Sequence, residues 1–307
     1  MKKEYDLGKM KSRTNPYIPQ TGEESVHLDN LSSGPRDELL QQQMIRRLRE
    51  LCQRDRCVVG ALMFGSFATG EGDQYSDIEF ALFFDDESLL RLDQRAWISQ
   101  IEPVELYFAD DYGHHTAIFA NLVRGEFHFE PASKIPIIET WQGYAWFPSM
   151  EATLIVDRTG AVERYLRPFI APPPDRNTPD EAASVIDNFI NLTLLGTNVL
   201  ARGEAARAWA LLGSLHANLL KLIRLAEGAT QHWPTPSRAL EADISARAYE
   251  RYRSCTADLD PSRLWPAYRN TWRFGCELVT QVGRRNQIAP PISVMGSLSE
   301  RIEAGCK

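Results

Sequence analysis

The sequence predicts an α+β protein, in which a domain built on a mixed sheet precedes a helical bundle. Two observations predict this class. Apolar segments of strand length recur between residues 58 and 131, whereas patterns with helical period dominate after residue 178. A proline-rich segment, APPPDRNTPDE (residues 171–181), lies between the two regions and indicates a stiff linker.

The expected domain limits follow from these changes in pattern. At 307 residues the chain is longer than one average domain. Residues 1–36 are polar and show no sustained apolar period, so we expect a flexible extension there. We expect residues 37–160 to form the sheet domain, and residues 161–307 to form a helical domain that completes the substrate cleft.

The composition indicates which classes of partner and which cellular compartment to expect. A formal net charge of −7 provides no broad basic surface, so no nucleic-acid partner is expected. Five cysteines without CxxC spacing suggest neither a disulfide framework nor a zinc site. No apolar stretch reaches the roughly 18 residues of a membrane span, and no apolar segment follows the charged N-terminus. We therefore expect a cytoplasmic protein without a membrane partner.

Two helices and five strands are expected in the first domain. Leu40, Met44, Leu48 and Leu51 form the apolar stripe of the first helix. A further helix fits between residues 86 and 100, after the second strand. The strand segments are VVGALMF (58–64), DIEFALFF (77–84), PVELYF (103–108), HTAIFANL (115–122) and EFHFEP (126–131).

Start and stop signals divide the second domain into helices. Thr178 is the expected N-cap, Pro179 the first helical residue, and Glu181 the capping-box partner of Thr178. The expected helices are residues 179–202, ended by Gly203; residues 204–227, ended by Gly228; one from about residue 240; and one from residue 261 into the 270s.

The segment GSFATGEGDQYSDIEF (65–80) carries the first candidate site. Asp77 and Glu79 are two residues apart in an expected strand, so both side chains point to one face. Two carboxylates about 7 Å apart repel each other unless a cation lies between them, and Mg²⁺ takes such ligands together with substrate phosphates. We therefore expect Asp77 and Glu79 to bind metal.

Gly65 and Ser66 are the candidate phosphate-binding residues. Gly65 lets the backbone approach a ligand closely, and a helix that opens at Ser66 directs free N–H groups and the Ser66 hydroxyl at an anion. The spacer between Ser66 and Asp77 has room for a short helix and a turn. We expect this geometry to place a nucleoside triphosphate between backbone amides and metal ions.

In this order, Gly-Ser, a spacer and Asp-x-Glu resemble the motif of the DNA polymerase beta-like nucleotidyltransferase superfamily. With FANLVRGEFHF and NVLARGEAARAW, the chain more closely resembles the lincosamide nucleotidyltransferases of the LinB and Lnu(F) type, over roughly residues 38–307. The resemblance implies an antibiotic-resistance enzyme that uses two Mg²⁺ ions to transfer AMP from ATP to a hydroxyl of lincomycin or clindamycin. It also suggests a homodimer.

The resemblance places a third carboxylate, a metal ligand or the base for the acceptor hydroxyl, at Glu126 in the RGEFHF strand. The residues by themselves leave Glu105 of the VELYF strand as a second candidate. We favour Glu126 because His128 is its polar neighbour on the same face, while phenylalanines occupy the other face. His114 and His115 point to opposite faces, so we expect no metal shared by these two.

Cations and aromatic residues complete the candidate set. Lys221 and Arg224, three apart on one helix face, are expected to bind the β- and γ-phosphates, although a solvated face gives the same pattern. Arg124 offers a similar contact. The segment WQGYAWFP (141–148), with Tyr144 among its aromatic residues, has the composition of a wall for an apolar ligand and also of a packing cluster.

Two alternative functions remain, and the first of them would use the same catalytic residues. An aminoglycoside nucleotidyltransferase would differ only in its acceptor pocket, which we expect to need more acidic residues than WQGYAWFP offers. A toxin-antitoxin module that nucleotidylates a protein would lack the large helical domain. The sequence therefore favours a lincosamide acceptor.

Overall fold

The computed structural model describes residues 38–305, apart from residues 112 and 144. The described residues from Leu39 onward belong to one compact unit. The predicted flexible extension, residues 1–36, lies outside the described residues. The predicted boundary between residues 160 and 161 stays a prediction.

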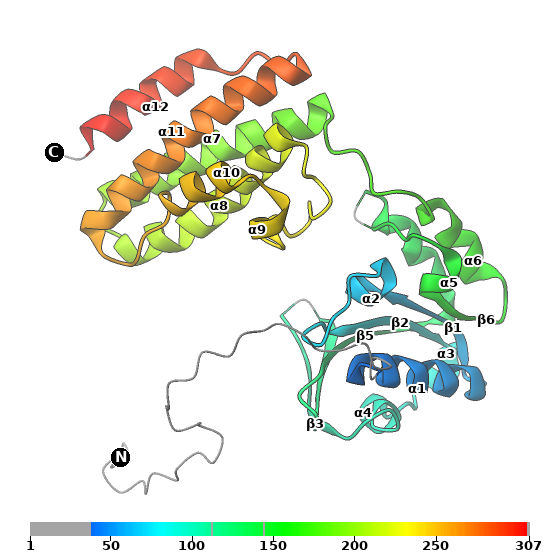
Figure 1. Cartoon of the computed structure of the whole chain (residues 1–307). Helices are drawn as coiled ribbons and strands as arrows, with labels where there is room; N and C mark the ends of the chain where they lie inside the picture. The colour runs from blue at the N-terminus through cyan, green and yellow to red at the C-terminus, as the bar shows by residue number, and fades with distance from the viewer. Residues whose placement is uncertain (1–37, 112, 144, 306–307) are drawn as a thin grey trace, which may run out of the picture. The chain divides into compact units, whose positions relative to one another are not determined.

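The first half of the described chain forms a six-stranded mixed sheet in the order β3-β4-β5-β2-β1-β6 (Figure 1). The β2–β5 pair is parallel, and the other neighbouring pairs are antiparallel. This confirms the predicted α+β class. The strands are β1 (Val58–Phe64), β2 (Ile78–Phe84), β3 (Val104–Ala109), β4 (His115–Phe119), β5 (Arg124–Pro131) and β6 (Leu154–Asp157).

Three details of this region differ from the sequence expectation. The predicted helix between residues 86 and 100 is two short helices, α3 (Asp86–Leu89) and α4 (Gln94–Ile98). Strand β6 was not predicted. Asp77 lies immediately before β2 and not within it.

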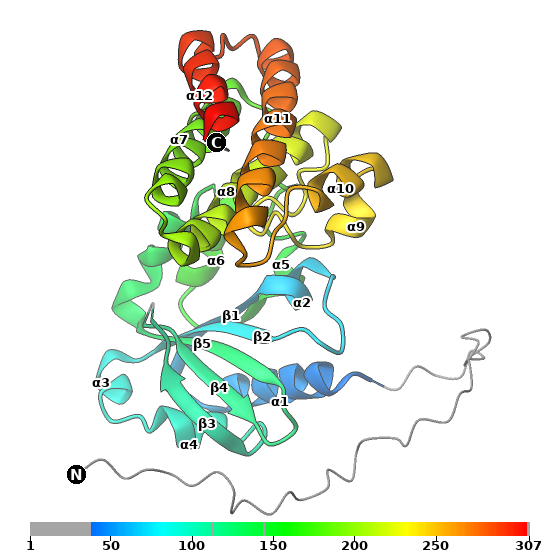
Figure 2. The same cartoon turned by 90° about the vertical axis from the view of Figure 1, so that its left-hand side faces the viewer.

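Helix α1 (Leu40–Arg54) and helix α2 (Gly65–Thr69) lie on opposite sides of the sheet in both views (Figures 1 and 2). Met44, Leu48 and Leu51 of α1 are buried as predicted, whereas Leu40 is 53% exposed. The buried face is completed by neighbouring positions such as Ile45. The amphipathic stripe is therefore rotated slightly from the predicted one.

The burial pattern of β5, and of β2 around Glu79, explains how the sheet holds polar groups. Phe80 of β2 and Phe127 of β5 are fully buried and stack on each other. They are register partners, as are Glu79 and Glu126 one position earlier. Because successive side chains alternate faces, the same register that buries the phenylalanines brings the two carboxylates together on the opposite face.

The second half is helical, as predicted, and α7, α8 and α11 pack against one another (Figure 2). Thr178 caps α7 by accepting the Glu181 N–H, while the Glu181 carboxylate pairs with Arg176 and does not complete a capping box. Gly203 and Gly228 both have positive φ just beyond helix ends. The helices are α7 (Pro179–Ala201), α8 (Ala205–Glu227), α9 (Leu240–Asp243), α10 (Ala246–Arg253), α11 (Pro261–Asn286) and α12 (Ile292–Ala304).

The remaining helical segments of the first half are α5 (Met150–Thr153), α6 (Ala161–Leu166) and two short 3₁₀ segments, η2 (Ala132–Trp141) and η3 (Arg167–Phe169). Val162, Leu166 and Phe169 of these segments are buried in the same apolar core as the sheet. Among the described residues, no helix combines the length and apolarity needed to cross a membrane.

Candidate active site

Asp77, Glu79 and Glu126 meet at one end of the parallel β2–β5 pair. Glu79 is the register partner of Glu126, and Asp77 lies two residues before Glu79. All three are partly exposed. The sheet therefore brings together the three carboxylates predicted as metal ligands, with Asp77 contributed by the end of a loop.

The turn at Gly65 is fitted closely against Glu79. Gly65 has a φ of 70°, and a methyl group on its Cα would lie 1.4 Å from Glu79 Oε2. Only glycine meets both conditions without displacing the carboxylate. The Ser66 backbone N–H donates to Glu79, so this amide faces a carboxylate in the structure. Ser66 itself is 8% exposed, at the start of the five-residue helix α2.

The position of Glu79 is electrostatically costly. Burial, together with the nearby charges of Glu126 and Asp77, raises the pKa of Glu79. The Ser66 N–H and the Arg124 guanidinium act in the opposite direction but do not cancel this effect. A buried group of like charges is stabilised when a cation joins it, so the arrangement favours a cationic ligand.

Arg124 provides the cation that the protein itself places at this cluster. Its Nη1 donates to Asp77 Oδ2, and its Nη2 lies 3.6 Å from Glu126 Oε2. The Asp77 and Glu126 carboxylates thus face a shared positive charge. The phosphate contact expected for Arg124 stays a prediction, because in this structure its donors are directed at carboxylates.

Glu126 is held by two histidines as well as by Arg124. His128 Nε2 lies 2.9 Å and His114 Nδ1 lies 3.6 Å from Glu126 Oε1. The His128 hydrogen bond is the main cause that lowers the pKa of Glu126 below its ordinary value. The carboxylate is therefore ionised at neutral pH and able to accept a proton or a metal ion.

The alternative third carboxylate lies elsewhere. Glu105 is exposed on β3, which is an edge strand of the sheet. Two strands, β4 and β5, separate it from β2. The strand order thus places Glu126, and not Glu105, beside Glu79.

A hollow of about 440 Å³ opens over Asp77 and Glu79. It is also lined by Arg238, a residue that the sequence analysis did not single out. Arg238 Nη2 lies 3.0 Å from Glu71 Oε2, and Glu71 lines the same hollow. Arg238 lies in an irregular segment without a motif, so no sequence signal distinguishes it from other surface arginines.

Two family models match the chain in the regions that contain these features. A nucleotidyltransferase domain model matches residues 45–138, and a model described as lincosamide nucleotidyltransferase-like, C-terminal domain, matches residues 178–301. The chain is a nucleotidyltransferase. Among curated proteins, none matches it.

Two solved structures resemble the nucleotidyltransferase over most of its length. One is an aminoglycoside 6-adenyltransferase from Bacillus subtilis, with 14% identity, a TM-score of 0.41, and coverage of 87% of this chain and 98% of that one. The other is a nucleotidyltransferase-like protein from Exiguobacterium sibiricum, with 14% identity, a TM-score of 0.37, and coverage of 86% and 89%.

In the nucleotidyltransferase, the two cations predicted to bind phosphates have other partners. The Lys221 ammonium lies 5.1 Å from the centroid of the Trp233 ring. Arg224 is fully buried, and its guanidinium donates to Asp243 and to backbone carbonyls, including that of Arg238. The sequence pattern treated Arg224 as a surface cation, whereas the structure uses it to hold the segment that follows α8.

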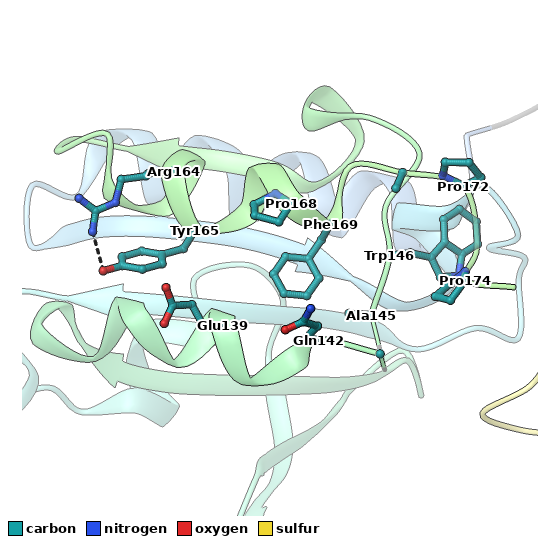
Figure 3. Close-up of a pocket in the computed structure, with 12 residues that line it drawn as sticks. Glu139, Gln142, Ala145, Trp146, Arg164, Tyr165, Pro168, Phe169, Pro172 and Pro174 are labelled. Carbon is teal, nitrogen blue, oxygen red and sulfur yellow. Dashed lines mark hydrogen bonds between the residues drawn. The ribbon is translucent and has the colours of Figure 1, made fainter. Parts of the chain in front are cut away.

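The aromatic segment borders a cavity of about 630 Å³ in the nucleotidyltransferase (Figure 3). Trp146, Tyr165 and Phe169 supply aromatic surface, and Glu139 supplies a carboxylate. Trp146 also lines a second cavity, of about 250 Å³, which reaches Gly65. Trp146 therefore borders both the aromatic cavity and the space beside the Gly65 turn. Tyr144 lies outside the described residues.

Proposed function

We propose that this nucleotidyltransferase transfers AMP from ATP to a hydroxyl group of a lincosamide such as clindamycin, releases pyrophosphate and thereby confers resistance in the cytoplasm. The observation that supports it most is the meeting of Asp77, Glu79 and Glu126 beside the Gly65 turn. The match of residues 178–301 to the lincosamide nucleotidyltransferase-like domain supports the class of acceptor.

The donor set fits a hard divalent metal. Three carboxylates supply oxygen ligands, and the raised pKa of Glu79 indicates negative charge that Arg124 alone does not compensate. We assign Asp77, Glu79 and Glu126 as ligands of two Mg²⁺ ions. When bound, Mg²⁺ neutralises the triphosphate and stabilises charge on the departing pyrophosphate.

The protein's own residues position the reactants. Gly65 lacks a side chain where the backbone passes Glu79, so a triphosphate can approach the turn closely. Glu126, ionised and oriented by His128 at 2.9 Å, accepts the proton of the acceptor hydroxyl. The hydroxyl oxygen then forms the bond to the α-phosphorus, while the bond to pyrophosphate breaks in line.

We assign the aromatic cavity to the acceptor. Lincosamides carry a sugar, an alkyl chain and a basic amine, which match aromatic walls and one carboxylate. Trp146 and Phe169 supply the apolar surface, and Glu139 supplies the charge that faces the amine. The cavity shares Trp146 with the space that reaches Gly65, so an acceptor bound there lies on the side of the catalytic turn.

The test is mass spectrometry of clindamycin and of kanamycin after separate incubation with the protein, ATP and Mg²⁺. We expect AMP to be added to clindamycin only, with pyrophosphate released, and no product with the Asp77→Asn variant. Modification of kanamycin alone would mean that the acceptor is an aminoglycoside and not a lincosamide. Absence of product with both drugs would contradict the proposed acceptor class.

A further inference from the structure

We propose that His114, Glu126 and His128 form a site for a borderline transition-metal ion such as Zn²⁺, which shares Glu126 with the proposed Mg²⁺ site, and that its occupancy inhibits the enzyme. One ligand atom from each of these residues lies within 4.8 Å of the other two. The two histidine contacts to Glu126 Oε1, 2.9 Å and 3.6 Å, lie just on either side of the spacing of ligands around one ion, roughly 3–3.5 Å for bonds near 2.0–2.1 Å, so small side-chain movements would bring them into it.

The chemistry of the three donors selects against Mg²⁺. Imidazole nitrogens suit Zn²⁺, Co²⁺ and related ions, whereas Mg²⁺ takes oxygen ligands and water. Two histidines and one carboxylate are a donor set found in zinc sites with one open position. A zinc ion here takes the place of the hydrogen shared by His128 and Glu126, and leaves Glu126 Oε2 to Arg124.

The surroundings hold the three side chains ready. The His114 backbone N–H donates to Asp110 Oδ1, which fixes the turn that carries it. Asp110 Oδ2 lies 3.9 Å from His114 Nδ1, so a second carboxylate lies near the imidazole nitrogen that faces Glu126. The His128 ring packs edge-on against Phe64. The His114 and His128 rings stack with centroids 4.2 Å apart, and His114 is 41% exposed, so its ring can turn toward an ion.

Inhibition follows from the double use of Glu126. A zinc ion bound at Oε1 removes the atom that His128 orients for proton transfer. The binding claim stands without the proposed function, whereas the inhibition rests on it. The two claims therefore need separate measurements.

Metal binding is tested on the full chain after removal of metals with EDTA. Zn²⁺ is titrated by calorimetry and Co²⁺ by its visible absorption, both in excess Mg²⁺. We expect one ion per chain, and dissociation constants raised about tenfold or more in His114→Ala and in His128→Ala. His115→Ala is the matched control, because the neighbouring His115 ring stacks on Tyr107. Asp77→Asn controls for the Mg²⁺ site, and circular dichroism verifies folding.

We expect both controls to bind as the wild type does. Unchanged binding in His114→Ala and His128→Ala, or equal losses in His115→Ala, would overturn the site. For inhibition, we expect Zn²⁺ to lower the rate of drug modification in the wild type. In His114→Ala, the same Zn²⁺ concentration should lower the rate less. Zinc binding without any drug modification would support the metal site and contradict the proposed acceptor. Failure of the metal site and failure of the proposed function can therefore be distinguished.

Discussion

Glu79 of β2 and Glu126 of β5 are register partners in the parallel pair of the sheet, so their carboxylates project from the same face. The two residues are far apart in the sequence, and neither strand alone forms a site. Their meeting depends on β5 lying next to β2, while β3, which carries Glu105, lies at the edge. The strand order thus selects the third carboxylate.

The first prediction concerns Asp77, which lies at the end of the loop before β2. Its side chain is 37% exposed and pairs with Arg124. Asp77→Asn removes one charge from the ligand set without disturbing the core. We expect kcat to fall by about 10²–10³-fold or more, the scale for losing one electrostatic group at a transition state. Steady-state rates of AMP transfer and a thermal melt measure both effects.

Glu105→Gln is the control for Asp77→Asn, because it removes a carboxylate from an exposed edge strand. We expect this variant to keep its rate. If Glu105→Gln lost activity and Asp77→Asn kept it, the assignment of the metal ligands to Asp77 and the β2–β5 pair would be wrong.

The second prediction separates two effects of Gly65. Gly65→Ala introduces strain at a φ of 70° and a methyl group 1.4 Å from Glu79 Oε2. Gly70→Ala introduces the same strain at a φ of 81°, but its methyl group meets no described atom within 4 Å. We expect each to lose on the order of 1 kcal/mol of stability from the backbone, and only Gly65→Ala to lose most activity.

Urea unfolding and AMP-transfer rates, measured for both alanine variants, give the comparison. Equal activity losses would mean that the turn matters only through its backbone conformation. A large loss confined to Gly65→Ala would show that the contact with Glu79 matters.

The sequence predicts the local elements of the catalytic region well. The strand at residues 58–64 has the predicted bounds, because its apolar run ends at the Gly65 turn. The start of α7 follows from Thr178 and Pro179, whose capping and dihedral preferences are local. These features depend on neighbouring residues only, so a pattern can reveal them.

Features that depend on tertiary packing could not be predicted from the sequence. The periodic pattern of α8 places Arg224 on a cationic face, but the segment that folds over this face buries it. Strand β6 is only four residues long and gives too short a period to detect. Arg238 reaches the hollow through the same segment, which no sequence rule positions.

The third prediction concerns the pH dependence of stability. The pKa of Glu79 is raised from 4.5, mainly by burial and then by Glu126 and Asp77. The folded state therefore binds this proton more tightly than the unfolded chain does. The resulting stability is present below pH 4.5 and is lost as the pH rises through the raised pKa.

We expect Glu79→Gln to increase the free energy of unfolding of the metal-free protein at neutral pH, since the amide carries no charge. Below pH 4.5 the difference from the wild type should disappear. Urea unfolding in EDTA over a pH series measures it, and Mg²⁺ should stabilise the wild type more than the variant. A difference that did not change with pH would contradict the electrostatic account.

The fourth prediction separates a structural from a phosphate-binding role for Arg224. Arg224→Met removes the buried cation that pairs with Asp243, leaves His232 as the remaining partner of that carboxylate, and leaves several carbonyls without their Arg224 donor. We expect about 3–5 kcal/mol of lost stability, the usual cost of removing one partner of a buried ion pair. Lys221→Ala removes only a contact with the Trp233 ring and should cost about 0.5–1 kcal/mol.

Urea unfolding measures these stability losses, and the KM for ATP at low temperature provides the second readout. A residue that binds the β- and γ-phosphates would raise the KM for ATP when removed, with little change in stability. Because the Arg224 guanidinium is buried and has no exposed surface to offer a ligand, we expect the opposite for Arg224→Met: a large loss of stability and little change in the KM for ATP. An Arg224→Met variant with unchanged stability and a raised KM would restore the phosphate-binding role predicted from the helix pattern.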